Sequence, residues 1–297
     1  MAETVVAIRG LVKHYGPVEA VRGIDLEIGR GEVFGFLGPN GAGKSTTIRC
    51  LMGLLVPTAG HVEAFGMDAT REGVSLRRRV AYVPGELRLP ERLTGAQLVA
   101  DIGRLRGGFD PKRVAGLVAR LGLDLDRPVR DLSTGNRRKV ALLLAFSSDA
   151  ELLVLDEPTQ GLDPLIQREF LGLLAEAKAA AKTVFLSSHV LSEVQRAADR
   201  VAVLRSGQVI ATGTVEDLRR RARQRIEVWF EGPTPTAEIA GVAGIGEVRS
   251  DGGRLTATLA GPIAPLLAVL ARHAVTSMLV EEPDLEEAFL DLYANAA

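Results

Sequence analysis

The sequence predicts an α/β fold in two parts, a larger domain of alternating strands and helices followed by a smaller α+β domain. A strand, a glycine-rich loop and a helix follow one another over residues 32–52. The apolar run at 152–157 is typical of a buried parallel strand. After residue 220 the pattern resets to short elements in the order βαββαβ, which favours a ferredoxin-like domain.

Composition narrows the class of protein. The chain has 297 residues, a formal net charge of −1 and one cysteine, Cys50. The charge gives no overall attraction to nucleic acid or anionic lipid, and a single cysteine excludes an internal disulfide. No apolar run is long enough to span a bilayer and the N-terminus lacks a secretory pattern. We therefore expect a cytoplasmic protein that reaches a membrane only through a partner.

The loop at residues 38–46 matches the phosphate-binding pattern G-x-x-x-x-G-K-[ST]. Its glycines let backbone N–H groups turn towards an anion, Lys44 can reach the β- and γ-phosphates, and the Ser45 hydroxyl can join the ligands of Mg²⁺. The bland alternative is a glycine-rich turn, which the flanking strand and helix disfavour. The expected nucleotide-binding residues are Gly38, Pro39, Asn40, Gly41, Ala42, Gly43, Lys44, Ser45 and Thr46.

The strands around this loop bring further candidates. Two runs at 5–9 and 23–28 read as strands joined through a turn at 13–17, which carries Tyr15. Tyr15 could stack on a base, or it could be an ordinary surface aromatic. The run at 152–157 ends in Asp156 and Glu157. Asp156 is placed to hold Mg²⁺ and Glu157 to orient or deprotonate an attacking water, although surface charge is the alternative.

Two later candidates are weaker when taken alone. Residues 94–130 show helical periodicity and predict a mostly helical insert. Ser133 then opens another helix, either as a simple N-cap or as part of a second anion site. His189 ends the strand predicted at 183–189, where it could contact a γ-phosphate or be structural.

In this order, the elements over residues 4 to about 220 resemble the nucleotide-binding subunit of an ATP-binding-cassette (ABC) transporter. The loop matches the Walker A motif and 152–157 matches Walker B with its catalytic glutamate, Glu157. Residues 132–136 resemble the LSGGQ signature, with Ser133, Gly135 and Asn136 as the expected nucleotide contacts. In the same resemblance Tyr15 is the adenine-stacking aromatic, Asp163 lies in the D-loop and His189 is the switch histidine.

The resemblance implies a P-loop NTPase domain over 1–220, with a mixed sheet core and a helical subdomain at about 86–145, and an accessory domain over 221–297. It also implies ATP and Mg²⁺, the latter held by Ser45 and Asp156, and a homodimer in which the signature of one copy closes the loop of the other. Hydrolysis would drive a separate membrane permease, which would hold the chain on the inner face of the cell membrane.

Two departures from the family pattern stand out. The signature reads S-T-G-N in place of S-G-G-Q, and Gly85-Glu86 replaces the glutamine that usually follows the strand at 81–84. Because glycine has no side chain to reach Mg²⁺, either Glu86 takes over this coupling role or water fills the position.

The C-terminal part carries no catalytic pattern, so we expect a regulatory or dimer-supporting role. The arginine-rich run at 219–225 could meet lipid headgroups or an acidic surface, but a solvated helix end is the favoured interpretation. A last amphipathic helix is expected at 285–293. Such a tail resembles export-type subunits, which favours export of a drug-, antibiotic- or lipid-like substrate over import.

The alternative function is a soluble ABC-type ATPase that acts on a ribosome or nucleic acid. Such relatives usually carry two cassettes or a long coiled-coil insert, and this sequence has neither. A P-loop kinase or GTPase is disfavoured by the signature and by the Asp-Glu pair. No nucleic-acid partner is expected.

Overall fold

The computed structural model describes residues 3–217 and 224–281. The chain divides into two compact units, Met1–Thr212 and Gly213–Ala297, and each is described by itself. The sequence-based boundary at residue 220 lies slightly downstream of this division. Within the described ranges, no helix is long and apolar enough to cross a membrane.

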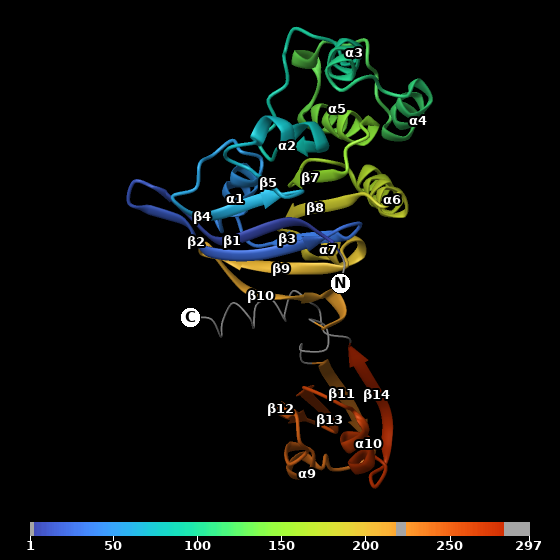
Figure 1. Ribbon diagram of the computed structural model, residues 1–297. Coiled ribbons are helices and arrows are strands. Elements are labelled where there is room, and N and C mark those ends of the chain that lie inside the picture. The colour runs from blue at the N-terminus through green and yellow to red at the C-terminus, as the bar shows by residue number, and fades with distance from the viewer. Residues whose placement is uncertain (1–2, 218–223, 282–297) are drawn as a thin grey trace. The chain divides into compact units, whose positions relative to one another are not determined.

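The first unit is built on a six-stranded sheet of order β10-β9-β3-β8-β7-β6 (Figure 1). Its strands from β9 to β6 run parallel, and the residues of β3, β7 and β8 are all buried. Parallel strands covered on both faces read as continuous apolar runs, which is why the sequence reveals them. The strands are β3 (Val33–Leu37), β6 (Val80–Val83), β7 (Leu152–Asp156), β8 (Thr183–Ser188), β9 (Arg200–Arg205) and β10 (Gln208–Thr214).

A second sheet of order β2-β1-β4-β5 is antiparallel. Its strands are β1 (Thr4–Tyr15), β2 (Val18–Gly29), β4 (Ala59–Ala64) and β5 (Met67–Asp68). Helix α1 (Lys44–Leu51) lies in the core that both sheets share, where Ile48 and Leu51 are fully buried. The helix that follows the glycine-rich loop is therefore fixed by packing on both sides.

The first two strands are longer than the runs predicted at 5–9 and 23–28. β1 continues to Tyr15, so the predicted turn at 13–17 shrinks to Gly16 and Pro17. Register shifts interrupt β1 after Ile8, near Gly10, which has a φ of +55°. Such bulges break the alternation of apolar and polar residues, and the strand beyond them is then invisible to a pattern of period two.

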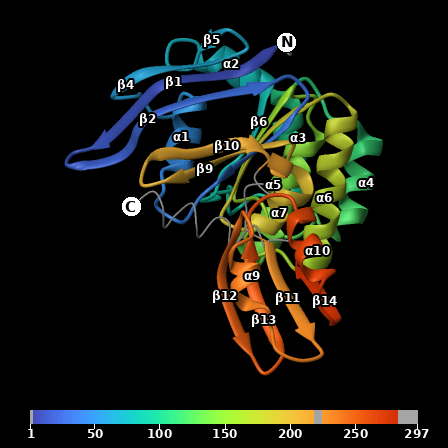
Figure 2. The ribbon, with the colours of Figure 1, turned by 90° about the horizontal axis from the view of Figure 1, so that it is seen from below.

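The helical part comprises α2 (Gly73–Arg79), α3 (Gly95–Leu105), α4 (Pro111–Leu121), a short 3₁₀ turn (Val129–Asp131) and α5 (Thr134–Ser147). Local sequence sets its boundaries: Thr94 and Gln97 form a capping box at α3, and Asp110 caps α4 ahead of Pro111. In Figure 1, α3, α4 and α5 lie together beyond the sheets. Figure 2 shows α4 beside α6 (Pro164–Ala179), and α7 (Leu191–Ala197) follows β8.

Three phenylalanines from neighbouring strands fill the centre of the parallel sheet's core. The ring centroid of Phe185 lies 6.1 Å from that of Phe34 and 5.3 Å from that of Phe36, and all three side chains are fully buried. Tilted rings at these separations attract one another beyond the effect of burial alone. This cluster stabilises the strands whose ends carry the candidate site.

Phe185→Ala is expected to lower the free energy of unfolding by about 3–5 kcal/mol, because it removes a buried ring and leaves a cavity that the rigid sheet cannot close. Urea denaturation measures the change. The control is Leu105→Ala, whose side chain is 83% exposed and whose effect should stay within about 0.5 kcal/mol. Equal effects of the two substitutions would contradict this account of the core.

The second unit has the order βαββαβ that the sequence predicts, and its ferredoxin-like fold is confirmed. The sheet order is β12-β13-β11-β14 with antiparallel pairing, and in the described part of this unit two helices pack into the hydrophobic core with the sheet. The predicted helix at 285–293 and most of the arginine-rich run lie outside the described residues. The elements are β11 (Gln224–Phe230), α9 (Thr236–Ala240), β12 (Ile245–Asp251), β13 (Arg254–Leu259), α10 (Ala264–Leu270) and β14 (Val275–Glu281).

Candidate nucleotide site

The glycine-rich loop connects β3 to α1 and needs glycine at two positions for steric reasons. Gly43, the residue before α1, has a φ of +108°, and a Cβ there would lie 2.5 Å from the carbonyl oxygen of Ala20. A Cβ on Gly38 would lie 2.4 Å from the carbonyl oxygen of Leu204. The loop is thus held against β2 and β9, and the free N–H groups of the first turn of α1 form an anion site.

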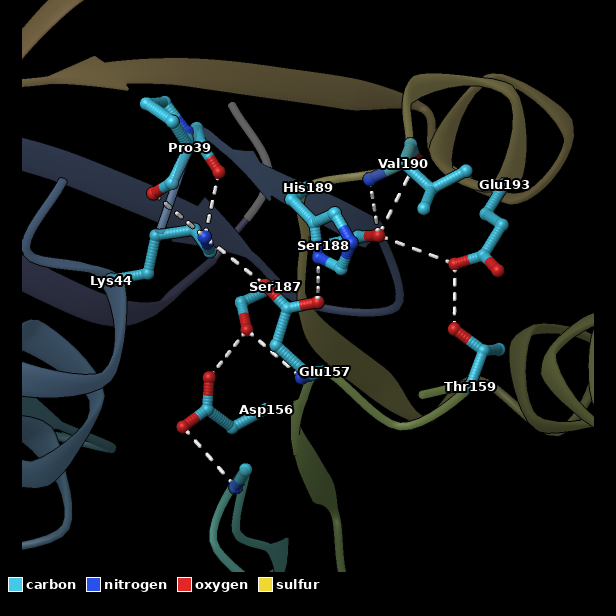
Figure 3. Close-up of polar contacts among 12 residues, drawn as sticks. Pro39, Lys44, Asp156, Glu157, Thr159, Ser187, Ser188, His189, Val190 and Glu193 are labelled. Carbon is cyan, nitrogen blue, oxygen red and sulfur yellow. Dashed lines mark hydrogen bonds and ion pairs between the residues drawn. The ribbon is translucent and has the colours of Figure 1, made fainter. Parts of the chain in front are cut away.

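Lys44 occupies the centre of this loop and is only 5% exposed. Its Nζ donates to the carbonyl oxygens of Gly38 at 2.6 Å and Pro39 at 3.2 Å, and lies 3.0 Å from Oε1 of Glu157 (Figure 3). These contacts close the loop around the ammonium group. A phosphate that enters the loop would therefore compete with Glu157 for Lys44.

Strand register brings the acidic residues to the same edge of the sheet. Leu37 at the end of β3 pairs with Ser188, and Asp156 at the end of β7 pairs with Ser187. Asp156 is 1% exposed, and its Oδ1 accepts a hydrogen bond from the Ser187 hydroxyl at 2.6 Å. A buried polar atom needs a hydrogen-bond partner, so Ser187 satisfies this oxygen and fixes the orientation of the Asp156 carboxylate.

Glu157 follows β7 in a left-handed conformation with a φ of 49°. For a residue that is not glycine this conformation costs about 1–2 kcal/mol, and such strain is concentrated at functional sites. The backbone N–H of Glu157 lies 3.1 Å from Ser187 Oγ, which holds the strained turn. The turn directs the carboxylate towards Lys44 on one side and His189 on the other.

His189 comes directly after β8 and completes this group. Its Nδ1 lies 2.7 Å from Oε2 of Glu157, so one carboxylate joins the lysine and the histidine (Figure 3). Nearby, Glu193 of α7 accepts hydrogen bonds from the hydroxyls of Thr159 at 2.6 Å and Ser188 at 3.2 Å. These bonds connect the segment after Glu157 to the one around His189.

The signature residues occupy a different place. Ser133 is the N-cap of α5 and accepts a hydrogen bond from the Asn136 N–H at 3.2 Å. Gly135 packs so closely on Gly161 that a Cβ would lie 2.8 Å from its carbonyl oxygen. Asp163 caps α6 by accepting hydrogen bonds from two N–H groups of its first turn. In the described part of the chain, no hydrogen bond or ion pair joins these residues to the loop at 38–46.

Tyr15 lies at the exposed end of β1, with Nζ of Lys13 5.5 Å from the centroid of its ring. The strand that returns from this hairpin passes the loop at Ala20, next to Gly43. Tyr15 is 44% exposed and belongs to the same hairpin as the strand that contacts the loop.

Two residues in the site, Ser187 and Glu193, were missed by the sequence analysis. Ser187 and Glu193 have only a weak signal, because serine at the end of a strand and glutamate on a helix are common. The Glu86 side chain is 77% exposed, and its carboxylate lies 3.8 Å from a guanidinium nitrogen of Arg49. The alternative in which Glu86 takes over the role of the family glutamine stays a prediction. The backbone N–H of Gly85 faces Asp156, at 3.3 Å from Oδ2.

Comparison with known proteins agrees with this geometry. The profile of the family described as ABC transporter matches residues 21–160. The chain is 31% identical over 296 residues to the linearmycin resistance ATP-binding protein LnrL of Bacillus subtilis, which covers 94% of this chain and 95% of that protein. This chain is a member of the ABC transporter family. The predicted ATP-binding and ATP-hydrolysing subunit is thereby confirmed.

Other ABC relatives agree on this assignment. The daunorubicin/doxorubicin resistance ATP-binding protein DrrA of Streptomyces peucetius is 40% identical over 215 residues, and the match covers 71% of this chain but only 65% of that protein. A solved ATP-binding subunit of an ABC transporter is 30% identical with a TM-score of 0.66, over 73% of this chain and 92% of that one. A dimeric cassette bound to ADP and Pi, 23% identical with a TM-score of 0.65 over 71% of this chain and 98% of that one, shows the same fold.

Proposed function

We propose that the chain is the ATP-hydrolysing motor of an exporter whose membrane permease is a separate protein. The observation that carries the motor is the convergence of Lys44, Glu157 and His189 at one sheet edge, beside the buried Asp156. Phosphoryl transfer to water uses a cation for the phosphates and a residue that positions or deprotonates the water, and the histidine contacts and can orient this carboxylate.

The residues present also fit Mg²⁺. Ser45 in the first turn of α1 offers a hydroxyl, and Asp156 offers a carboxylate whose orientation is fixed by Ser187 and Gly85. No group of three or more His, Cys, Asp or Glu in the described ranges could hold a metal ion. This suits Mg²⁺, which is usually bound through one or two protein groups, substrate phosphates and water. When bound, Mg²⁺ would neutralise charge that develops on the phosphates.

The protein groups would act in a defined order. ATP binds to the loop N–H groups, and Lys44 exchanges the carboxylate of Glu157 for phosphate oxygens. Glu157 is then free to accept a proton from a water molecule in line with the γ-phosphate. His189 keeps its contact with Glu157 and orients this carboxylate. Tyr15 stacks on the adenine from the side of the β1–β2 hairpin.

We further propose that two copies of the chain enclose the ATP. Ser133, Gly135 and Asn136 lie at the N-terminal end of α5. Gly135 packs against Gly161, two residues before Asp163, which is the N-cap of α6. The N-terminus of a helix attracts a phosphate, so this end of α5 can complete the site of a second copy. The dimeric cassette bound to ADP and Pi supports this arrangement by analogy of fold.

Export is supported by the names of the relatives. They include resistance proteins for daunorubicin/doxorubicin and linearmycin, and the Nod factor export ATP-binding protein I of Cupriavidus pinatubonensis, which is 33% identical over 97% of this chain and 90% of that protein. We propose a drug-, antibiotic- or lipid-like substrate, and a location on the inner face of the cell membrane through the permease.

The concentration dependence of ATP hydrolysis tests the two-copy site. If each site needs two chains, specific activity should rise with protein concentration and level off once the dimer predominates. A steady-state phosphate-release assay over a wide range of protein concentration measures this. A rate strictly proportional to concentration, with high activity throughout, would contradict the shared site. Reconstitution with the permease, followed by stimulation of the ATPase by candidate substrates, tests the transport role.

A further inference from the structure

Arg138, on the helix that begins at the signature, reaches across to the loop after β6. Its guanidinium donates to the carbonyl oxygens of Pro84 at 2.7 Å and Gly85 at 2.8 Å. The side chain is only 4% exposed, and its Nε has no hydrogen-bond partner in the described part of the chain. Burying an unpaired N–H group costs about 1–3 kcal/mol. The two hydrogen bonds to backbone carbonyl groups are therefore made at a cost to the stability of the fold.

Two carboxylates compensate part of this cost. Burial lowers the pKa of the Arg138 guanidinium, while the charges of Asp156 and Glu157 act in the opposite direction. The charge of Arg138 therefore interacts with both acids of the site, although its hydrogen bonds are made to backbone carbonyl groups.

The same glycine that accepts from Arg138 also faces the metal-binding candidate. The N–H of Gly85 lies 3.3 Å from Asp156 Oδ2, and a Cβ on Gly85 would lie 3.0 Å from that oxygen. The hydrogen bond is long by ordinary standards, so a small movement of Gly85 would tighten or break it. The carbonyl group of Pro84, held by Arg138, belongs to the same planar peptide unit as this N–H and so fixes its orientation.

We propose that Arg138 is a positioning residue that orients Asp156 through the backbone of Gly85, and so sets the affinity of the site for Mg²⁺. This inference rests on the proposed ATPase site. Gly85 stands where the family usually has a glutamine, so this position has no side chain that could reach the metal site. In this chain, Arg138 and the backbone N–H of Gly85 link the signature helix to the metal site instead. A shift of α5 would change the length of the hydrogen bond between the Gly85 N–H and Asp156.

The chain offers a matched control in Arg106, directly after α3. Its guanidinium donates to the carbonyl oxygen of Val80 in β6 at 2.8 Å. It thus joins the helical part to the strand that leads to Gly85 by the same kind of bond. In the described ranges, no hydrogen bond or ion pair joins it to Asp156. Arg106→Gln removes a link of this kind without touching the proposed path.

The test measures metal binding separately from hydrolysis. A fluorescent ATP analogue is titrated onto each full-length variant at equilibrium, first in EDTA and then with increasing Mg²⁺. Arg138→Gln should raise the half-saturating Mg²⁺ concentration roughly tenfold, because loss of a group that orients a metal ligand typically costs 10–100-fold in metal affinity. Binding in EDTA should change less than about twofold, because the loop at 38–46 is intact. Arg106→Gln should leave both values unchanged.

The outcomes separate the proposals. An unchanged Mg²⁺ midpoint in Arg138→Gln, or an equal shift in Arg106→Gln, overturns the role of Arg138. A wild-type chain that binds no nucleotide would instead overturn the proposed function. If Arg138→Gln does not fold, Arg138→Lys keeps the charge but cannot donate to both carbonyl groups in the same geometry, and it should shift the midpoint in the same direction.

A double-mutant cycle tests the path itself. Gly85→Ala presses directly on Asp156 Oδ2, so it should raise the Mg²⁺ midpoint without help from Arg138. In that background, Arg138→Gln should add little, because the bond that it controls is already displaced. Independent, multiplicative effects of the two substitutions would mean that Arg138 does not act through Gly85.

Discussion

Glu157→Gln is expected to lower kcat for ATP hydrolysis by roughly 10²–10⁴-fold while ATP still binds, because the amide keeps the shape of the carboxylate but cannot accept the proton of water. The substitution also removes the ion pair with Lys44. Since phosphate oxygens must displace Glu157 from this lysine, ATP should bind more tightly to the variant than to the wild type. Slow turnover and tight binding should together trap a dimer in the presence of ATP.

Phosphate release under single-turnover conditions measures the rate, and gel filtration with ATP measures the dimer. The matched control is Glu151→Gln, just before the opposite end of the same strand, where the hydrogen bond with Arg79 holds the pKa of Glu151 below its usual value. This control removes a charge at a distance from the loop and should leave kcat nearly unchanged. Hydrolysis by Glu157→Gln at the wild-type rate would show that Glu157 is not the base.

Much of the site could be predicted from the sequence because it is encoded locally. The loop at 38–46 has its own pattern, and the buried strand before Asp156 is a continuous apolar run. The rule that parallel strands end at the same edge then implies that Asp156, Glu157 and His189 lie near the loop. The contacts in which Glu157 joins Lys44 to His189 follow from strand register, which no local pattern specifies.

The parts that the sequence does not reveal depend on backbone groups and on bulges. The hydrogen bond between the Gly85 N–H and Asp156 involves an atom that every residue except proline carries, so nothing in the sequence marks it. Ser187 acts through a single hydroxyl at the end of an apolar strand. β1 extends beyond its predicted end because its bulges hide the alternation. The fold of the second unit was easier to predict, because short elements in a fixed order permit few arrangements of the strands in a sheet.

Lys44→Ala is expected to weaken ATP binding by about 10²-fold. A hydrogen bond to a charged group contributes about 1.5–3 kcal/mol, and each 1.4 kcal/mol is a factor of ten in affinity. The loss has a second cause, because Nζ of Lys44 also holds the carbonyl oxygens of Gly38 and Pro39 and so keeps the loop closed. Equilibrium titration with a fluorescent ATP analogue measures the change.

The control is Lys182→Ala, which removes another partly buried lysine that donates to a backbone carbonyl group, that of Ser148 at 2.7 Å. Nucleotide affinity should not change in this variant, even if its stability falls. Equal loss of affinity in both variants would mean that the effect of Lys44→Ala arises from unfolding of the loop or the domain.

The ion pair between Lys44 and Glu157 also predicts the result of a double substitution. In Lys44→Ala the carboxylate of Glu157 stays close to the place of the missing ammonium group, where it repels the phosphates. Adding Glu157→Gln to Lys44→Ala should therefore restore part of the lost affinity. In the wild-type background the same substitution improves binding by freeing Lys44, so its two effects have different origins. If Glu157→Gln in the Lys44→Ala background weakens binding further, repulsion between the Glu157 carboxylate and the phosphates is not the mechanism.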